Sequence, residues 1–301
     1  MLRRFCYATA MPDAIVYLNG QFVPRSQAKL DIEDRGAMFA DGVYEVTRFY
    51  QARPFAIDAH IARLRRSLRE IRIEPPAQLD GLAALNDELI QRNSLAEAIV
   101  YWQVTRGSAV RKHAFPPAAA PTFFMIGYPT RPLDPAAPPA VKTAITAPDL
   151  RWHRCSIKSL MLLPNVLARQ QAAEAGAEEA ILHRDGVITE GAATSVCIVR
   201  GGQLWTHPAN HLILGSITRA IVLELAGELG IAVREATYTS DELLGADEVF
   251  LCGTVSHITP IGRIDQTPIG AGGAGPVTRR LHEALIARIV AECHLRQSSA
   301  V

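Results

Sequence analysis

One lysine and one glutamate in this chain have sequence surroundings that suit covalent chemistry. Lys158 lies in the apolar stretch Cys155–Leu160, which we expect to form a strand. Burial disfavours the ammonium form of lysine and favours a nucleophilic amine, which can form a Schiff base with a carbonyl group. Further along, Glu190 in the segment Ile188–Gly191 offers a carboxylate that can keep a ring nitrogen protonated. The pair fits a reaction in which a protonated ring withdraws electrons from a covalently held substrate.

Each of the two residues also has an ordinary structural explanation. Most lysines are solvated surface groups, and Lys158 can extend from a strand to reach water. Glu190 can be a turn carboxylate beside Gly191. The chemical assignment therefore depends on the segments that accompany them.

Several further segments occur with this pair in one order. They are Glu33–Gly36, Phe39–Glu45, Gln103–Gly107, Ile157–Leu160, Thr206–Asn210 and Leu214–Arg219. Together they resemble the class IV, fold-type IV, pyridoxal-phosphate aminotransferases over nearly the whole chain, from about Tyr17 to the last helix. Within that family the stretch Arg106–Pro116 makes the chain most similar to the D-amino acid aminotransferases.

The resemblance implies catalytic roles for Lys158 and Glu190. Lys158 would hold pyridoxal 5′-phosphate as a Schiff base and, once the substrate releases it, would move the proton between the substrate Cα and the cofactor carbon. Glu190 would pair with the protonated pyridine nitrogen. The implied reaction is a ping-pong transamination between a D-amino acid, such as D-alanine, and a 2-oxo acid, such as 2-oxoglutarate.

The resemblance also implies a set of cofactor-binding residues. Arg63 stands where the family places its phosphate arginine, although other arginines on the same predicted helix are chemically equivalent. A helix that begins after Ser216 would offer free N–H groups to the phosphate. The remaining implied contacts are Ile217, Thr218, Thr254, Thr194 and Leu214, of which Leu214 would pack against the cofactor ring.

The substrate carboxylate is assigned to Tyr44, Arg111 and His113, which match the carboxylate trap of D-amino acid aminotransferases. Arginine can hold a carboxylate through two parallel hydrogen bonds. In that family the loop reaches across a dimer interface, so the resemblance implies a homodimer with shared active sites. The alternative is that Arg111, Lys112 and His113 form an exposed basic loop.

Two departures from the family pattern concern cofactor binding and the loop. The family run Glu-Gly-Ser-Ser-Ser-Asn is replaced here by Glu190–Ser195, in which Ala192 and Ala193 lack two hydroxyl groups. Thr194 retains one hydroxyl. The centre of the Arg-x-His arrangement is Lys112, whose extra cation either aids dicarboxylate binding or faces solvent.

The pattern of apolar residues and turn residues predicts the elements that must position these side chains. In the first part, strands are expected at 15–18, 21–23, 43–50, 98–105 and 122–127, and helices at 58–72, capped by Asp58, and at 79–92. In the second part, strands are expected at 141–146, 179–183, 196–199, 203–205, 231–235 and 248–252, and helices at 162–175, 216–229 and 276–294.

The implied fold class is α/β (α+β mixed), with two domains. Residues 13–128 would form a small N-terminal α/β domain, and residues 141–301 a larger C-terminal domain with a barrel-like sheet that binds the cofactor. The proline-rich residues 129–140 favour an extended linker between them. Residues 1–12 are expected to be a disordered or mis-annotated extension, with Met11 as an alternative start to Met1.

Composition narrows the possible classes of protein. The chain is 49% hydrophobic and 20% charged with a net charge of +1, which is typical of a soluble globular protein without nucleic-acid partners. No run approaches the roughly 18 apolar residues that a membrane span requires. Five cysteines without paired spacing are expected to be reduced, mostly buried thiols, as in a cytoplasmic protein. The nine histidines lack metal-ligand spacing, so no metal site is predicted.

Three alternatives share part of this pattern. A branched-chain L-amino acid aminotransferase would keep the lysine and glutamate but hold the substrate carboxylate in another pocket. An aminodeoxychorismate lyase-like enzyme would release pyruvate without a 2-oxo acid acceptor. A non-catalytic pyridoxal-phosphate binding protein would bind the cofactor and transfer no amine.

Overall fold

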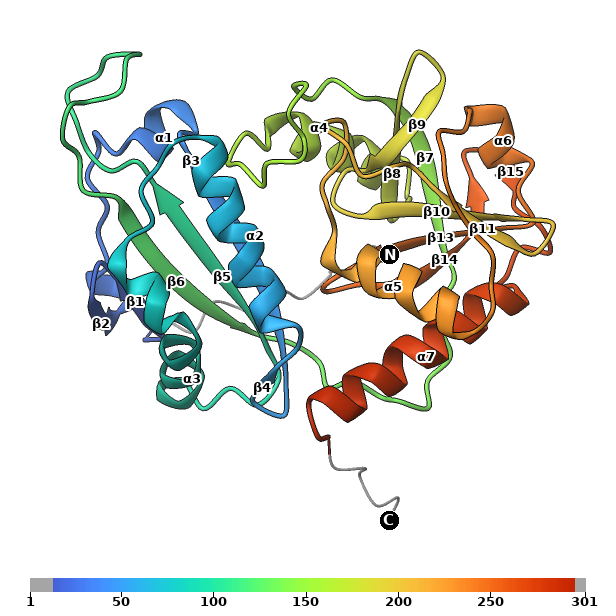
Figure 1. The fold of residues 1–301 in the computed structure, drawn as a ribbon, viewed down its shortest axis with the longest axis horizontal. Helices are drawn as coiled ribbons and strands as arrows, with labels where there is room; N and C mark the ends of the chain where they lie inside the picture. Colours follow the sequence, from blue (N-terminus) through green and yellow to red (C-terminus); the bar gives the residue numbers. More distant parts are fainter. Residues whose placement is uncertain (1–12, 296–301) are drawn as a thin grey trace. The chain divides into compact units, whose positions relative to one another are not determined.

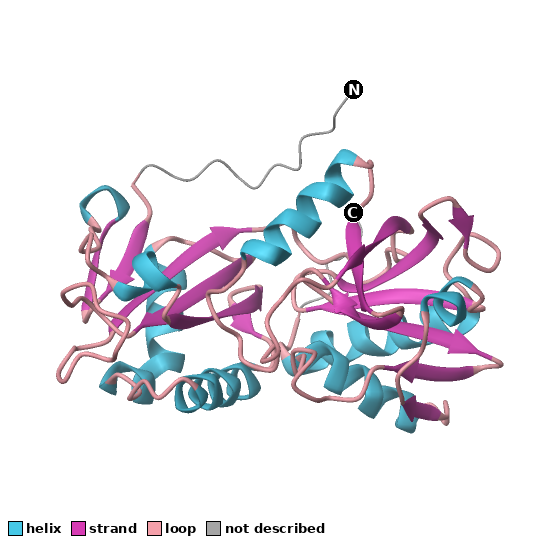
Figure 2. Cartoon of the chain, turned by 90° about the horizontal axis from the view of Figure 1, so that it is seen from above, coloured by secondary structure: helices cyan, strands magenta, loops and turns pink. Residues whose placement is uncertain are grey.

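The computed structural model describes residues 13–295, which form two compact units. The first unit contains the described residues up to Leu133, the short segment Ile157–Leu160 and residues 292–295. The second contains Asp134–Ser156 and Met161–Ala291. Both units contain strands and helices (Figures 1 and 2), so the mixed α/β class is confirmed. The predicted extension at residues 1–12 lies outside the described residues.

The first unit is built on a six-stranded sheet with the order β2-β1-β6-β5-β3-β4. Its strands are β1 (Ile15–Leu18), β2 (Gln21–Pro24), β3 (Gly42–Tyr50), β4 (Arg53–Pro54), β5 (Ala98–Thr105) and β6 (Thr122–Pro129). The long strands β3, β5 and β6 pair antiparallel, with Tyr44 opposite Gln103 and Gln103 opposite Phe124. The predicted hairpin at Asn19 and Gly20 is confirmed, because both residues adopt the positive φ that a tight two-residue turn requires.

Helices cover this sheet in the first unit (Figure 1). They are α1 (Arg35–Phe39), α2 (Ile57–Glu70) and α3 (Leu82–Arg92), with the short 3-10 turns Arg25–Gln27 and Ala77–Gly81. α2 packs on β3 and α3 packs on β1 and β6. The buried positions of α2 recur every three or four residues, and they include the polar side chains His60, Arg63 and Ser67 beside Leu64 and Leu68.

The prediction that Asp58 caps α2 is wrong. The helix begins one residue earlier, after Ala56, which has φ 52° and makes no side-chain cap. Asp58 lies inside the first turn, where its negative charge still interacts favourably with the helix dipole. A left-handed residue before the helix has no signature in a sequence that shows alanine there.

The second unit contains a nine-stranded sheet with the order β12-β11-β10-β13-β14-β7-β8-β9, and β15 pairs with β14. Its strands are β7 (Lys142–Pro148), β8 (Glu179–Arg184), β9 (Val187–Gly191), β10 (Ser195–Arg200), β11 (Gln203–Thr206), β12 (Val233–Glu235), β13 (Glu248–Gly253), β14 (His257–Ile264) and β15 (Thr267–Pro268). β9 at one end of the order also contacts β10, so the sheet curls as a barrel-like sheet does. Its helices are α4 (Leu163–Glu174), α5 (Ile217–Glu228), α6 (Ser240–Leu244) and α7 (Pro276–Glu292).

Alternate residues of these strands serve two separate cores. In β7, Ala144 joins the cluster that contains Val196, Ile198 and Leu251, whereas its neighbour Ile145 packs with residues of α4. This alternation follows from the two-residue period of a strand. Residues on both faces of β7 are therefore buried.

Several segments of the chain differ from the expected elements. Cys155–Leu160 is a turn with a single bridge between Ser159 and Val43, and not a strand. β14 was not expected, because Pro260 and Gly262 disfavour a regular strand, and its pairing with β7 is indeed irregular between Ile261 and Arg263. β9 and the short helices α1 and α6 were also not expected, because elements of about five residues have little periodicity.

Candidate active site

The segment that carries Lys158 is held by backbone hydrogen bonds in the first unit. The Lys158 carbonyl accepts from the Tyr44 N–H at 3.0 Å, and the Leu160 N–H donates to the Gly42 carbonyl at 3.0 Å. The Lys158 N–H donates to Ser67 Oγ on α2 at 3.3 Å. The side chain then reaches across Tyr44, with Nζ 4.3 Å from the centre of the phenol ring. Two of the predicted site residues, Lys158 and Tyr44, are thus in contact.

Arg63, the predicted phosphate arginine, forms a buried ion pair with Glu45. Its Nε and Nη2 donate to the two Glu45 oxygens at 2.6 and 2.8 Å, and His60 Nδ1 donates to the same carboxylate at 2.9 Å. Burial alone would raise the pKa of Glu45, but Arg63 and His60 outweigh it and lower that pKa to about 2. Burial distinguishes Arg63 from the more exposed Arg65, Arg66 and Arg69 on the same helix. Its role toward a phosphate stays a prediction.

We expect Glu45→Gln to lower the free energy of unfolding by about 3–5 kcal/mol at pH 7, because it leaves the buried Arg63 guanidinium without its charge partner. Since the folded pKa of Glu45 lies below its ordinary value of 4.5, the stabilisation is present above about pH 4.5 and is lost as the pH falls toward about 2. Urea unfolding of both proteins at several pH values measures the difference. The control Glu88→Gln, at an exposed pair with Arg92, should cost less than about 1 kcal/mol. A difference that stays constant from pH 7 to pH 3 would contradict the assignment.

The loop that carries Arg111 and His113 is anchored by Arg35. This buried guanidinium donates to the Lys112 carbonyl at 2.6 Å and to the His113 carbonyl at 3.4 Å. Asp41 holds Arg35 at 2.8 Å and also binds Arg106, so one carboxylate fixes both arginines. Because Arg106 and Arg35 lie beside it, the pKa of Asp41 is lowered against the opposing effect of burial.

Arg111 and His113 are exposed and both contact Phe39. The Arg111 guanidinium lies 5.1 Å from the Phe39 ring centre, and the His113 and Phe39 ring centres are 5.5 Å apart. Tyr44, the third member of the predicted carboxylate trap, stacks on Tyr101 at 5.6 Å. Arg111 and His113 are thus brought together, whereas Tyr44 has a different set of neighbours. Their joint role toward a carboxylate stays a prediction.

Glu190 lies in the second unit, at the end of β9, and is buried. Arg151 Nη1 pairs with its Oε1 atom, and the Leu214 N–H donates to both carboxylate oxygens at 3.1 Å. Burial raises the pKa of Glu190, and Arg151 and the Leu214 N–H oppose that rise. Leu214, which was predicted to pack against a ring, also has this backbone role.

The predicted phosphate-binding residues of the second unit lie at the start of α5 and in a turn. Ser216 caps α5, as predicted, by accepting the Arg219 N–H at 3.1 Å. Ile217 and Thr218 occupy the first helical turn, whose N–H groups have no acceptor inside the helix. Thr254 lies in the turn between β13 and β14. Thr194 donates its hydroxyl proton to Glu179 Oε2 at 3.0 Å, so only its lone pairs are left for a ligand.

Pyridoxal 5′-phosphate fits the donors and acceptors of the second unit. The anionic phosphate suits the N-terminus of α5, where the helix dipole and free N–H groups favour negative charge. The protonated ring nitrogen suits Glu190, whose Oε2 atom accepts only from Leu214 among the contacts in this unit. The buried Ser195 hydroxyl has no hydrogen-bond partner in the described part of the chain, as expected for a group that faces a ligand.

The fold and these residues define a class of enzyme, and comparison with known proteins identifies it. The family model for amino-transferases of class IV matches residues 42–264. The chain therefore belongs to the class IV aminotransferase family, as the resemblance predicts, and is an aminotransferase that uses pyridoxal 5′-phosphate.

Similar proteins fall into two groups. The D-alanine aminotransferase of Bacillus licheniformis is 43% identical over 277 residues, which cover 92% of this chain and 98% of that protein. A D-alanine aminotransferase of Staphylococcus aureus is 38% identical over 89% of this chain and 95% of its own length. Among solved structures, the branched-chain amino acid aminotransferase of Escherichia coli superposes with a TM-score of 0.85 at 28% identity, covering 93% of this chain and 96% of that one. The holo-form of the enzyme of that name from Thermobaculum terrenum gives a TM-score of 0.80 at 27% identity, covering 94% and 97%.

Several residues around the predicted site were not found from the sequence. Asp149 and Arg151 support Glu190, and Glu45 and His60 hold Arg63. One signal for Asp149 and Arg151 was present: two residues of opposite charge stand two apart, directly after β7. The other pairs join residues of different elements, and nothing in the sequence marks that proximity.

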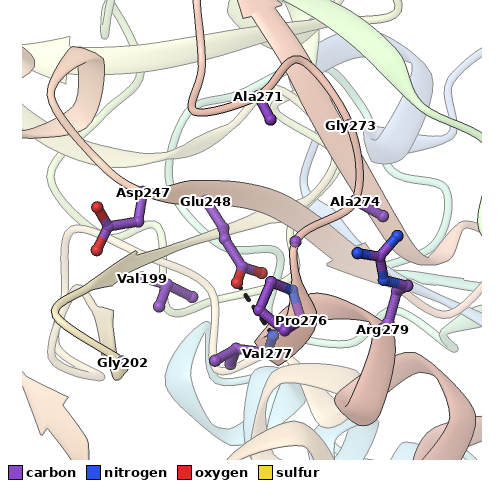
Figure 3. A pocket seen from close by; sticks show the side chains of 11 residues that line it. Val199, Gly202, Asp247, Glu248, Ala271, Gly273, Ala274, Pro276, Val277 and Arg279 are labelled. Atoms are coloured by element: carbon purple, nitrogen blue, oxygen red, sulfur yellow. Dashed lines mark hydrogen bonds between the residues drawn. The ribbon is translucent and has the colours of Figure 1, made fainter.

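A surface hollow of about 470 Å³ lies elsewhere in the second unit, at the start of α7 (Figure 3). Glu248 accepts from the N–H groups of Val277 and Thr278 at 3.0 and 2.7 Å and so caps this helix. None of the predicted site residues lines the hollow.

No cluster of three or more histidine, cysteine, aspartate or glutamate side chains suited to a metal occurs within residues 13–295. No helix in that range is long and apolar enough to cross a membrane.

Proposed function

We propose that this enzyme transfers the amino group of a D-amino acid, such as D-alanine, to a 2-oxo acid, such as 2-oxoglutarate. The observation that carries the proposal is the anchored loop in which Arg111 and His113 stand together on Phe39. The identity of 43% to a D-alanine aminotransferase supports the same substrate class. The alternative is transfer from a branched-chain L-amino acid, which the names of the similar solved structures suggest.

In the proposed mechanism each of the predicted site residues has its own role. When bound, pyridoxal phosphate supplies a carbonyl group for the substrate amine and a ring that withdraws electrons from the substrate Cα. Lys158 Nζ would hold the cofactor covalently at rest and, once released, would serve as the base that moves the Cα proton. Glu190 would keep the ring nitrogen protonated. Arg63, Ser216, Ile217, Thr218 and Thr254 would hold the phosphate, Leu214 and Thr194 the ring, and Tyr44, Arg111 and His113 the substrate carboxylate.

Cofactor absorbance in the purified holoenzyme tests the substrate class. D-alanine is expected to convert the pyridoxal form to the pyridoxamine form, and 2-oxoglutarate is expected to reverse the change. Conversion by L-leucine and not by D-alanine would assign the chain to the branched-chain reaction. Release of pyruvate without any acceptor would indicate a lyase.

Arg111→Ala is expected to lower kcat/KM for D-alanine by about 10–100-fold, because it removes charge-assisted hydrogen bonds to the substrate carboxylate. His113→Ala should have a smaller effect of the same sign. Lys112→Ala is the matched control, since Arg35 holds this residue through its backbone carbonyl and the anchor survives the substitution. The assignment is wrong if the double variant of Arg111 and His113 retains nearly full activity with D-alanine.

We infer that the enzyme is a homodimer with shared active sites. Leu163, Val166 and Leu167 project from one face of α4 and are 68%, 58% and 61% exposed, which is unusual for large apolar side chains on one helix face. A second copy of the chain would bury them. Val166→Glu is expected to convert the dimer to a monomer in light scattering, whereas the control Val255→Glu, at an exposed turn residue, should not.

Mixing two variants of strongly reduced activity tests whether the active sites are shared. If Lys158 of one subunit works with Arg111 of the other, re-associated Lys158→Ala and Arg111→Ala subunits form hybrid dimers with one intact site. About a quarter of the wild-type activity should then return, because half of the randomly formed dimers are hybrids and each has one working site. No recovery with hybrids present would mean that each subunit carries a complete site.

We also propose a cytoplasmic location. The four described cysteines, Cys155, Cys197, Cys252 and Cys293, are free and buried, which is typical of proteins that fold in a reducing compartment. Fractionation of the source cells with an antibody to the chain tests this location.

A further inference from the structure

Arg151 lies between two buried carboxylates of the second unit. Its Nε and Nη2 donate to the two Asp149 oxygens at 2.9 and 2.7 Å, and its Nη1 pairs with Glu190. Arg151, Asp149 and Glu190 are 9%, 8% and 5% exposed. A guanidinium that spans two carboxylates in this way cannot rotate without breaking three hydrogen bonds. The position of the Arg151 guanidinium relative to the Glu190 carboxylate is therefore fixed.

Asp149 is itself fixed by residues around it. Thr189, the neighbour of Glu190, donates its hydroxyl to Asp149 Oδ2 at 2.9 Å, and Arg184 Nε donates to the same oxygen at 3.2 Å. Burial would raise the pKa of Asp149, but Arg151 outweighs it and lowers that pKa to about 2. Asp149 therefore stays an anion, and its negative charge stabilises the buried positive charge of Arg151.

Glu190 depends on Arg151 for its charge state. Its other hydrogen bond comes from the neutral Leu214 N–H, and the negative charge of Asp149 acts against ionisation. The nearby Cys155 thiol is neutral near pH 7, because burial raises its pKa to about 11. Without Arg151, the buried carboxyl would have one neutral donor and a nearby negative charge, and its protonated form would be favoured. The protonated oxygen of a carboxyl group donates a hydrogen bond. It cannot accept the hydrogen bond that a protonated ring nitrogen donates.

We propose that Arg151 is a positioning residue that keeps Glu190 ionised and oriented toward the cofactor ring nitrogen, and that Asp149 holds Arg151 for this task. The inference rests on the proposed role of Glu190 in a pyridoxal-phosphate reaction. It goes beyond that role because it assigns the protonation of the ring to a three-residue chain of ion pairs. Arg151 does not touch the substrate in this scheme.

The test follows the protonation of the ring nitrogen directly, by nitrogen NMR of the holoenzyme loaded with ¹⁵N-labelled pyridoxal phosphate. In the wild type the nitrogen should be protonated at neutral pH. In Arg151→Met the proton should be lost, as in Glu190→Gln, and kcat should fall by about 10–100-fold. The matched control is Arg184→Met, which removes another arginine from Asp149 but makes no contact with Glu190. It should keep the ring protonated.

Arg151→Lys keeps the inference testable if Arg151→Met does not fold. Lysine retains the charge but cannot span both carboxylates at once, so the ring should lose its proton at a lower pH than in the wild type. Activity adds a second readout: combining Arg151→Met, or Arg151→Lys, with Glu190→Gln should lower kcat little beyond Glu190→Gln alone.

A ring that stays protonated in both arginine variants, or losses that simply add in the double variant, would overturn the inference. A wild-type ring without the proton would overturn it as well. If the ring behaves as expected but D-alanine donates no amine, the substrate proposal fails while the role of Arg151 stands.

Discussion

Lys158→Ala is expected to lower kcat for D-alanine transamination by at least about 10⁴-fold, because in the proposed mechanism Lys158 is both the covalent attachment and the base that moves the Cα proton. The backbone of this segment should stay in place, since Tyr44, Gly42 and Ser67 hold it through main-chain atoms of 158 and 160. The lost contact of Nζ with the Tyr44 ring is worth about 1 kcal/mol or less. Single-turnover absorbance measurements with D-alanine check the rate.

The control for this substitution is Lys29→Ala, at an exposed lysine of the first unit. It should leave kcat and the unfolding midpoint unchanged. Thermal unfolding of Lys158→Ala separates loss of chemistry from loss of fold. Retention of more than a few per cent of the wild-type rate in a folded Lys158→Ala protein would exclude this lysine as the base.

Glu190→Gln is expected to lower kcat by about 10²–10³-fold, the usual cost of removing one preorganised electrostatic group from an active site. The amide has nearly the same shape, so it can still meet the Leu214 N–H but offers no negative charge to a protonated ring. KM for D-alanine should change much less than kcat, because the effect grows as charge develops in the reaction. Steady-state kinetics with D-alanine and 2-oxoglutarate separates the two parameters.

Glu248→Gln is the matched control for this variant. Glu248 is also a buried glutamate of the second unit that accepts backbone N–H groups, but it caps α7. We expect it to lower stability and to leave kcat nearly unchanged. Equal losses of kcat in the two variants would mean that Glu190 supports activity by stabilising the fold and not by pairing with the ring nitrogen.

The sequence predicted the central elements well where a local rule applies. The Asn19-Gly20 hairpin, the Ser216 cap and the long strands β5 and β6 follow from turn geometry, capping and apolar runs within a few residues. The predictions of a helix cap at Asp58 and of a strand at Cys155–Leu160 were wrong. Both places have contacts with distant parts of the chain: the Ala56 N–H donates to Glu292, and Ser159 bridges to Val43. The predicted domain limits at 13–128, 129–140 and 141–301 stay a prediction, since compact units in one structure do not measure independent folding.

The sequence by itself determined the class of enzyme. It also predicts Lys158 and Glu190 as the central residues, because their types, their order and their flanking segments match those of the family. Only the tertiary structure decided which charged groups surround the predicted site residues. Arg151 and Asp149 lie beside Glu190, Glu45 and His60 pair with Arg63, and Arg35 anchors the loop that carries Arg111. The physical reason is that the pKa of a carboxyl group depends on burial and on charges within a few ångströms. Most of those neighbours come from other elements of the fold.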